Sequence, residues 1–256
     1  MTAFQKTIIF LRSALFMLLI SLFTMPYGVM LLILRFLLPP FARYRVVQGW
    51  SICAMWLIKH VLGIDYRVVG RENMPTQPSI ILCKHQSAWE TIALQRIFPP
   101  IIFVLKKELL NMPFFGWGLG SVPMIGIDRS GGKAALDQLL TQGIERLKLG
   151  FWVVVFPEGT RVAPGTTRRY KIGGAYFASN AGAPVVPVAH NGGDYWRKNA
   201  FLKYPGTITV SIGPAIDASG LTPEEVNARV ATWIEAEMRR ISPQHYQDET
   251  TARTPA

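Results

Sequence analysis

The sequence predicts an α/β protein with a central mixed sheet flanked by helices, preceded by an N-terminal apolar helical membrane anchor. Beyond residue 63, short runs rich in β-branched residues alternate with stretches of helical periodicity. This alternation is typical of a sheet covered by helices. Before that point, long apolar runs with few charges predominate. A chain of 256 residues is long enough for one such domain and an anchor.

The N-terminal run has the length and composition of a membrane helix. Residues 13–34 carry no charge and would form a helix about 33 Å long, enough to cross a bilayer core. Pro26 and Gly28 lie within it, so we expect a kink or a break. A second apolar stretch, 46–62, follows. Basic residues on both sides fit a re-entrant hairpin as well as a span, and a buried helix pair in a soluble protein is a third interpretation.

The strands and helices of the domain follow from hydrophobic periodicity. Thr222-Pro223-Glu224-Glu225 is a capping box with proline at the first helical position, and it predicts a final helix that ends at Pro243. We therefore divide the chain into anchoring helices (1–63), an α/β domain (64–242) and a tail expected to be disordered (243–256). The other expected elements are strands at 66–69, 79–83, 101–105, 152–156, 185–188 and 207–212, and helices at 88–97, 133–149 and 175–180.

The net charge of +11 is concentrated in the first 216 residues. A basic surface attracts phosphate as nucleic acid, anionic lipid or a phosphorylated substrate, and charge alone does not choose among these. Nucleic acid is disfavoured because the chain shows no recognition helix or basic motif interleaved with aromatic residues. The two cysteines, Cys53 and Cys83, show no metal or disulfide spacing, so we expect buried, reduced thiols. The four histidines show no metal-ligand spacing either.

A histidine stands directly after a predicted buried strand. His85 follows the strand at 79–83 by two residues, a position where α/β sheets place ligand sites. Glu90 comes five residues later and would meet His85 only if His85 lies in a turn and Glu90 in the first turn of the next helix. Two structural interpretations compete, since residues 87–90 are themselves a capping box and His85 could simply bond to a carbonyl oxygen.

Further polar segments follow other apolar runs. In the segment 124–130, an apolar run is followed by Asp128 and Arg129. The arginine side chain is suited to binding phosphate. The segment 152–161 is a fully apolar strand that stops at Pro157 and is followed by Glu158, Gly159, Thr160 and Arg161. Here the glycine allows close backbone approach to a ligand, and the other three supply polar groups. An ordinary surface pair and an ordinary strand exit are the alternatives. The segment 183–188 contains two prolines, which predict an edge or terminal strand because proline cannot donate to a ladder.

Taken in order, these four segments resemble the four motif blocks of the glycerolipid acyltransferase family, and more narrowly the bacterial 1-acylglycerol-3-phosphate acyltransferases. The first block is His85 with Glu90, the second is 126–129, the third is 156–161 and the fourth is 185–188. The resemblance covers roughly residues 65–215. The chain departs from the family at Glu90, where the family has aspartate.

The resemblance implies an enzyme that transfers a fatty acyl group from a thioester of coenzyme A or acyl carrier protein. The acceptor would be the 2-hydroxyl of lysophosphatidate, and the product phosphatidate. His85 would be the general base and Glu90 would orient it, with no metal or cofactor. Membrane lipids would be partners, and the active site would lie on the cytoplasmic face of the inner membrane. The implied phosphate-binding residues are Arg129, Glu158, Gly159, Thr160 and Arg161, while Val186 and Pro187 would line an acyl groove or be structural.

Two other functions are compatible with these features. The acceptor could be another lysolipid, such as a different lysophospholipid or lyso-ornithine lipid. Alternatively, the chain could bind anionic lipid at a membrane surface without catalysis. The ordered polar segments argue against the second interpretation, because lipid binding requires only charge and apolar area.

Overall fold

A mixed sheet of seven strands forms the centre of the protein, as predicted. The computed structural model describes residues 2–128 and 130–246. The strand order is β1-β7-β6-β2-β5-β3-β4, and neighbouring strands are parallel except for the antiparallel pair β6–β7. The strands are β1 (Ile64–Val69), β2 (Ile80–Cys83), β3 (Ile101–Lys106), β4 (Ile125–Ile127), β5 (Trp152–Val155), β6 (Val185–His190) and β7 (Gly206–Ile212).

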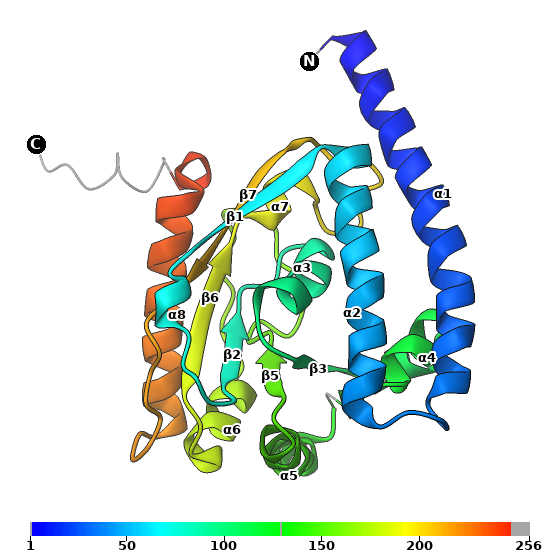
Figure 1. Cartoon of the computed structure of the whole chain (residues 1–256). Helices are drawn as coiled ribbons and strands as arrows, with labels where there is room; N and C mark the ends of the chain where they lie inside the picture. The colour runs from blue at the N-terminus through cyan, green and yellow to red at the C-terminus, as the bar shows by residue number, and fades with distance from the viewer. Residues whose placement is uncertain (1, 129, 247–256) are drawn as a thin grey trace, which may run out of the picture.

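Helices flank the sheet in the arrangement of Figure 1. α5, α6 and α8 pack side by side, with α8 also against β6, while α2 packs on α3. The helices are α1 (Ala3–Leu34), α2 (Pro40–Leu57), α3 (Trp89–Ile97), α4 (Phe115–Gly120), α5 (Gly132–Lys148), α6 (Gly173–Ala181), α7 (Gly192–Tyr195) and α8 (Pro223–Ile241). A π-helical turn, Ile58–Leu62, extends α2, and short 3₁₀ helices lie at Arg71–Asn73, Lys107–Asn111 and Pro243–His245. The capping box predicted at Thr222 is present.

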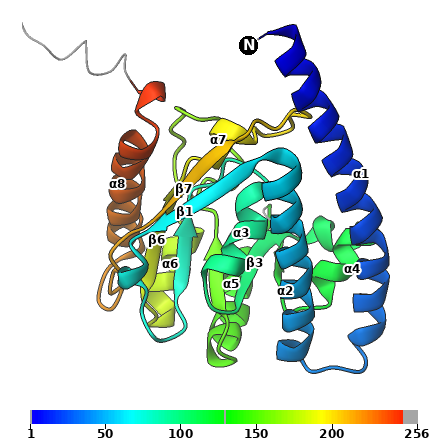
Figure 2. The ribbon, with the colours of Figure 1, turned by 45° about the horizontal axis from the view of Figure 1, so that its top comes forward.

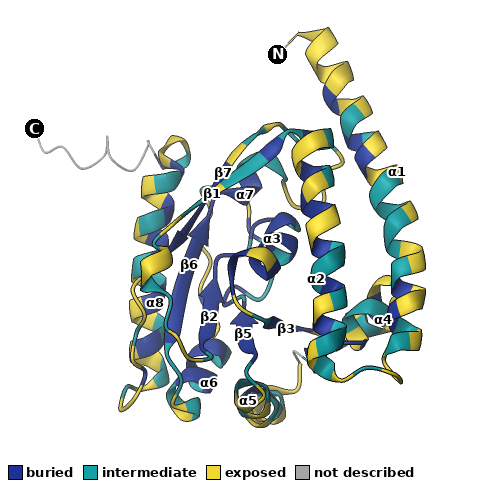
Figure 3. Ribbon diagram, viewed as in Figure 1, coloured by how far each residue is buried: buried dark blue, intermediate teal, exposed yellow. Residues whose placement is uncertain are grey.

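The central strands are buried along their whole length. β2, β5 and β6 consist of buried residues only, as the dark ribbons of Figure 3 show. A strand covered on both faces reads as a continuous apolar run, so these strands were recognisable in the sequence. β4 was not predicted as a strand, because its three residues are too few to show a period.

The prediction that the proline-framed strand lies at an edge is wrong. β6 lies between β2 and β7 in the interior of the sheet. Pro187 is tolerated because the paired register with β7 begins only at Val188. At Pro187 itself the carbonyl accepts from the Gly213 N–H at 2.9 Å, so the missing donor falls at the end of the ladder.

The two N-terminal helices form an antiparallel pair, seen from two directions in Figures 1 and 2. The expected break at Pro26 does not occur, since α1 continues through it. Neighbouring residues make tertiary contacts that offset the proline penalty of about 3 kcal/mol. The Tyr27 hydroxyl donates to the Val46 carbonyl at 2.6 Å, and the Trp50 indole donates to the Thr24 hydroxyl at 3.1 Å.

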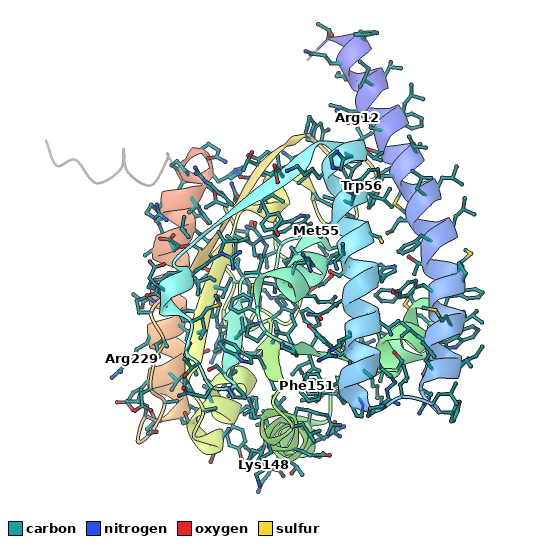
Figure 4. All side chains as sticks on the ribbon, in the orientation of Figure 1. Arg12, Met55, Trp56, Lys148, Phe151 and Arg229 are labelled. Atoms are coloured by element: carbon teal, nitrogen blue, oxygen red, sulfur yellow. The ribbon has the colours of Figure 1, made fainter. Side chains whose placement is uncertain are left out.

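Among the described residues, α1 is the one helix long and apolar enough to cross a membrane by length and composition. Its best window has a mean hydropathy of 2.2, and only 17% of that window is buried. Arg12 ties α1 to the end of the α2 extension by donating to the Val61 carbonyl at 2.7 Å, near Trp56 in Figure 4. The most exposed apolar side chains of α1 are Phe4, Phe10, Leu11, Leu18, Leu22 and Ile33.

Both cysteines are free thiols, as expected, but only one is buried. Cys83 lies in the core on β2, whereas Cys53 is exposed on α2. The prediction that both are buried is therefore wrong for Cys53. Its apolar surroundings in sequence reflect an outward apolar face of α2, which also exposes Ile52 and Trp56.

We expect Gly28→Ala to weaken the packing of α1 on α4. A Cβ at Gly28 would lie 2.4 Å from the carbonyl oxygen of Phe114, so the two backbones must separate. The free energy of unfolding should fall by about 1–3 kcal/mol, measured as a lower thermal midpoint in detergent micelles. Gly120→Ala is a matched control, because a Cβ there meets nothing within 4 Å. Equal midpoints for the two variants would contradict this packing.

Candidate active site

The predicted polar segments converge on one edge of the sheet. Strands β2, β3, β4, β5 and β6 are mutually parallel, so their carboxyl ends lie at the same edge, where α/β sheets bind ligands. The segment containing His85 leaves β2, and the segment containing Glu158 leaves β5, the immediate neighbour of β2.

His85 and Glu90 are in direct contact. His85 Nδ1 lies 2.8 Å from Glu90 Oε1, and Glu90 is fully buried whereas the His85 side chain is 16% exposed. His85 lies in the turn after β2, and Glu90 lies in the first turn of α3. This is the arrangement that the five-residue spacing requires for the two side chains to meet.

Glu90 is held in its ionised form. Burial raises the pKa of its carboxyl, but the imidazoles of His190 and His85 and the N–H of Ser87 outweigh burial, so the pKa of Glu90 is lowered. Its Oε1 also accepts from the backbone N–H groups of Gln86 and Ser87 at 3.0 and 2.9 Å. An ionised carboxylate only accepts hydrogen bonds, so His85 Nδ1 donates to it. The other ring nitrogen, Nε2, is thereby left unprotonated in the neutral imidazole.

The Glu90 carboxylate closes the turn that carries His85, but the full capping box predicted at 87–90 is not formed. The N-cap of α3 is Ala88, which makes no side-chain capping bond. The Ser87 hydroxyl accepts from the Trp89 N–H at 3.1 Å, and Glu90 Oε1 accepts from the Ser87 N–H. The same carboxylate oxygen contacts His85, so these bonds fix the turn that brings the imidazole and the carboxylate together.

The backbone and ring of His85 are also held by the segment after β5. The His85 N–H donates to Glu158 Oε2 at 2.8 Å, and the His85 carbonyl accepts from the Val162 N–H at 2.8 Å. The imidazole stacks on Phe156, with ring centroids 3.9 Å apart. Contacts on the main chain, on Nδ1 and on the ring face leave little freedom in the orientation of the ring.

Glu158 is fully buried. Besides the His85 N–H, it contacts the ammonium group of the buried Lys84 at 2.8 Å. Burial raises the pKa of the Glu158 carboxyl, and Lys84 opposes this rise. Glu158 thus lies beneath the turn that carries His85, inside the protein.

Gly159, Thr160 and Arg161 lie between Glu158 and Val162, the two residues that bind the His85 backbone. All three are partly exposed. Gly159 adopts a positive φ of 69°, which favours glycine. The Thr160 hydroxyl accepts from Lys198 at 3.5 Å. These three residues therefore adjoin, along the chain, the two that bind the His85 backbone, and exposed basic side chains follow in the sequence at Arg168, Arg169 and Lys171.

Arg129 lies outside the described residues. Its neighbour Asp128 follows β4, which is separated from β2 by β5 and β3. Asp128 pairs with Lys107 at 2.6 Å and accepts from Ser130. These bonds hold the pKa of Asp128 well below its ordinary value.

Val186 and Pro187 are core residues of β6. They pair in register with Ile81 and Leu82 of β2 and are buried. Their contact is therefore with β2, the strand that precedes the turn carrying His85.

Three residues of the site were missed in the sequence: Lys84, His190 and Glu235. His190 ends β6, and its Nε2 lies 2.8 Å from the Lys84 carbonyl while Nδ1 accepts from the Gly192 N–H. Burial lowers the pKa of His190, and Glu90 opposes this shift. Like His85, it stands at the end of a buried strand, which was an available signal. Nothing local marks Glu235, whose contact with Lys84 joins residues 151 positions apart.

Comparison with known proteins identifies relatives of the whole chain. A model of the Acyltransferase family matches residues 65–191. The chain is 49% identical to a 1-acyl-sn-glycerol-3-phosphate acyltransferase of Pseudomonas aeruginosa, over 93% of this chain and 95% of that one. It is 38% identical to the enzyme of that name from Saccharomyces cerevisiae, over 53% and 46% of the two chains.

A solved structure shows the same fold. The crystal structure of the 1-acyl-sn-glycerophosphate acyltransferase from Thermotoga maritima matches with a TM-score of 0.76 and 24% identity, covering 93% of this chain and 99% of that one. The similarity to the Pseudomonas aeruginosa protein extends over nearly the whole of both chains. The chain therefore belongs to the acyltransferase family, the family of these 1-acyl-sn-glycerol-3-phosphate acyltransferases.

Proposed function

We propose that this enzyme transfers a fatty acyl group from a thioester to the 2-hydroxyl of 1-acylglycerol-3-phosphate, giving phosphatidate. The observation that carries the proposal is the contact between His85 and the buried, ionised Glu90. The names of the relatives support lysophosphatidate as the acceptor.

In this mechanism His85 is the general base. Its unprotonated Nε2 takes the proton from the acceptor hydroxyl as the oxygen attacks the thioester carbonyl. The tetrahedral intermediate then collapses, the C–S bond breaks, and the thiolate leaves and takes up the proton. Glu90 stabilises the imidazolium that forms between these steps. A positioned base of this kind contributes roughly 10²–10⁴ to the rate. The acceptor supplies the nucleophile, so the enzyme needs no nucleophile of its own.

We assign the acceptor phosphate to the partly exposed groups beside His85. Arg161 can form paired hydrogen bonds with phosphate oxygens, and Gly159 and Thr160 adjoin it in the sequence. Arg129, which lies outside the described residues, would contribute a second guanidinium. Glu158 is buried and binds the His85 N–H, so we assign it to positioning His85 rather than to contact with the phosphate.

The N-terminal helices would anchor the enzyme where both acyl chains of the reaction reside. The exposed apolar face of α1 and its low burial support membrane contact. We assign residues 1–63 to the anchor and 64–242 to catalysis, at the cytoplasmic face of the inner membrane. The donor would be acyl coenzyme A or acyl carrier protein, both of which are water-soluble carriers. Val186 and Pro187 would support β2 from within the sheet.

His85→Ala should abolish acyl transfer while folding and membrane association persist. The expected loss in kcat is roughly 10²–10⁴, measured by thiol release from an acyl thioester with lysophosphatidate present. His60→Ala is the matched control, because His60 is exposed at the end of the α2 extension. Turnover near the normal rate in His85→Ala would refute the assignment of the base.

Glu90→Gln should lower kcat by about 10²-fold, because an amide keeps the size but removes the charge that stabilises the imidazolium. The folded-state pKa of Glu90 is lowered, so its ionised form contributes stability above its ordinary pKa, and this contribution is lost as the pH falls through the lowered value. At neutral pH the Glu90 carboxylate is charged, so kcat of the variant and of the wild type should be compared at that pH. A variant that keeps most of its activity would show that Glu90 only caps α3.

Arg161→Lys should raise KM for lysophosphatidate with a smaller change in kcat, since an ammonium group replaces a guanidinium fork. The loss in kcat/KM should be about 10-fold, in line with about 1.4 kcal/mol for one charged hydrogen bond. Arg229→Lys serves as control, because Arg229 is exposed on α8, on the side away from α1 in Figure 4. An unchanged KM in Arg161→Lys would remove Arg161 from the phosphate site.

A further inference from the structure

A buried lysine directly precedes the histidine of the active site. Lys84 is fully buried, which is rare for lysine unless it is paired. Its ammonium group lies 2.8 Å from Glu158 Oε1 and 2.7 Å from Glu235 Oε1. Burial lowers the pKa of Lys84, but the two carboxylates outweigh it and the pKa is raised. Lys84 is therefore charged and bound to two carboxylates beneath the turn that carries His85.

The second carboxylate comes from the C-terminal helix. Glu235 lies on α8, beyond the residues 65–191 that match the family model. Its Oε1 also accepts from the Tyr170 hydroxyl at 2.9 Å, and its Oε2 accepts from the Thr167 hydroxyl at 3.0 Å. These donors and Lys84 satisfy the Glu235 carboxylate, and a buried ion pair is maintained only where such additional bonds exist.

The buried group is connected to His85 through Glu158. One oxygen of Glu158 contacts Lys84 and the other accepts the His85 N–H. The carboxyl of Glu158 responds electrostatically to both Lys84 and His85. With Glu158 and Glu235 ionised, one positive and two negative charges leave a net charge of −1 beneath the imidazole.

We propose that Lys84 and Glu235 are positioning residues for His85: Lys84 holds Glu158 on the His85 N–H, and the charge of Glu235 favours the imidazolium formed during acyl transfer. The proposal rests on His85 being the general base. It makes α8 part of the catalytic apparatus rather than only a cover for the sheet.

Other charged and titratable groups among the described residues also face this cluster. On α8 itself, Arg239 donates to the Glu235 carbonyl at 3.2 Å. The Lys84 ammonium faces Glu158 from the segment after β5, Glu235 from α8, and the ring of Tyr170 at 5.9 Å. The hydroxyl of Tyr246, after α8, also interacts electrostatically with Lys84 and Glu235.

Among the described residues, titratable groups from α3, β6 and the segment after β5 lie near His85 itself. Glu90 from α3 contacts the ring, and Glu158 binds the backbone N–H. His190 from β6 lies 3.8 Å from Glu90, and burial lowers its pKa.

The test is the pH dependence of kcat/KM in Glu235→Gln. Loss of one negative charge makes the imidazolium less favourable, so the acid limb of the profile should move to lower pH, by about 0.5 unit or more. At the pH optimum kcat should fall about 10-fold, with KM for lysophosphatidate changed less than about twofold. Tyr170→Phe is the matched control, since it removes a bond to the same carboxylate without changing charge, and its acid limb should stay in place.

Glu235→Asp completes the experiment, because it keeps the charge while withdrawing it from Lys84. This variant should lower kcat and leave both the acid limb and KM unchanged. The electrostatic role would be overturned if the acid limb of Glu235→Gln coincided with that of the wild type. It would also be overturned if the acid limb of Tyr170→Phe moved as far as that of Glu235→Gln. If Glu235→Gln does not fold, an unchanged kcat in Glu235→Asp overturns the proposal. Activity retained in His85→Ala would instead overturn the proposed base, so the two failures are distinguishable.

Discussion

The buried carboxylate of Glu90 is the constraint on which the rest of the site depends. It accepts from two backbone N–H groups and from the His85 ring, so it simultaneously begins α3, closes the turn after β2 and sets the tautomer of the imidazole. A buried anion is stable only with such a set of donors. The same bonds that satisfy the charge therefore determine the direction in which the unprotonated nitrogen points.

The remainder of the fold keeps this turn in place. Parallel strands bring the segment after β5 beside the segment after β2, where Glu158 and Val162 bind the His85 backbone. Lys84 and Glu235 connect this arrangement to α8. At the opposite end of the sequence, α1 and α2 present an apolar surface, which would bring the site to substrates that reside in the bilayer. A site built on several elements is rigid, and rigidity is what a general base requires.

Local features of this site could be predicted from the sequence, whereas contacts between distant residues could not. The buried strands appear as continuous apolar runs. The five-residue spacing of His85 and Glu90 allows the two side chains to meet only when His85 lies in a turn and Glu90 in the first turn of the next helix. Position within the sheet has no local signal, so β6 was wrongly placed at an edge. A break at Pro26 was one expected outcome and does not occur, because contacts with α2 that have no local signal support α1 there. Lys84 appears in the sequence as an ordinary surface lysine, because the carboxylate that pairs with it lies 151 residues away.

The protonation of the His85 ring is the most direct measure of whether Glu90 orients the base. Nitrogen chemical shifts of ¹⁵N-labelled histidine distinguish a protonated from an unprotonated ring nitrogen, and comparison with His85→Gln assigns the signals. Our account predicts that the neutral His85 ring carries its proton on Nδ1 and none on Nε2. A ring with the proton on Nε2 would contradict it, because that nitrogen could not then accept a proton from the acceptor hydroxyl.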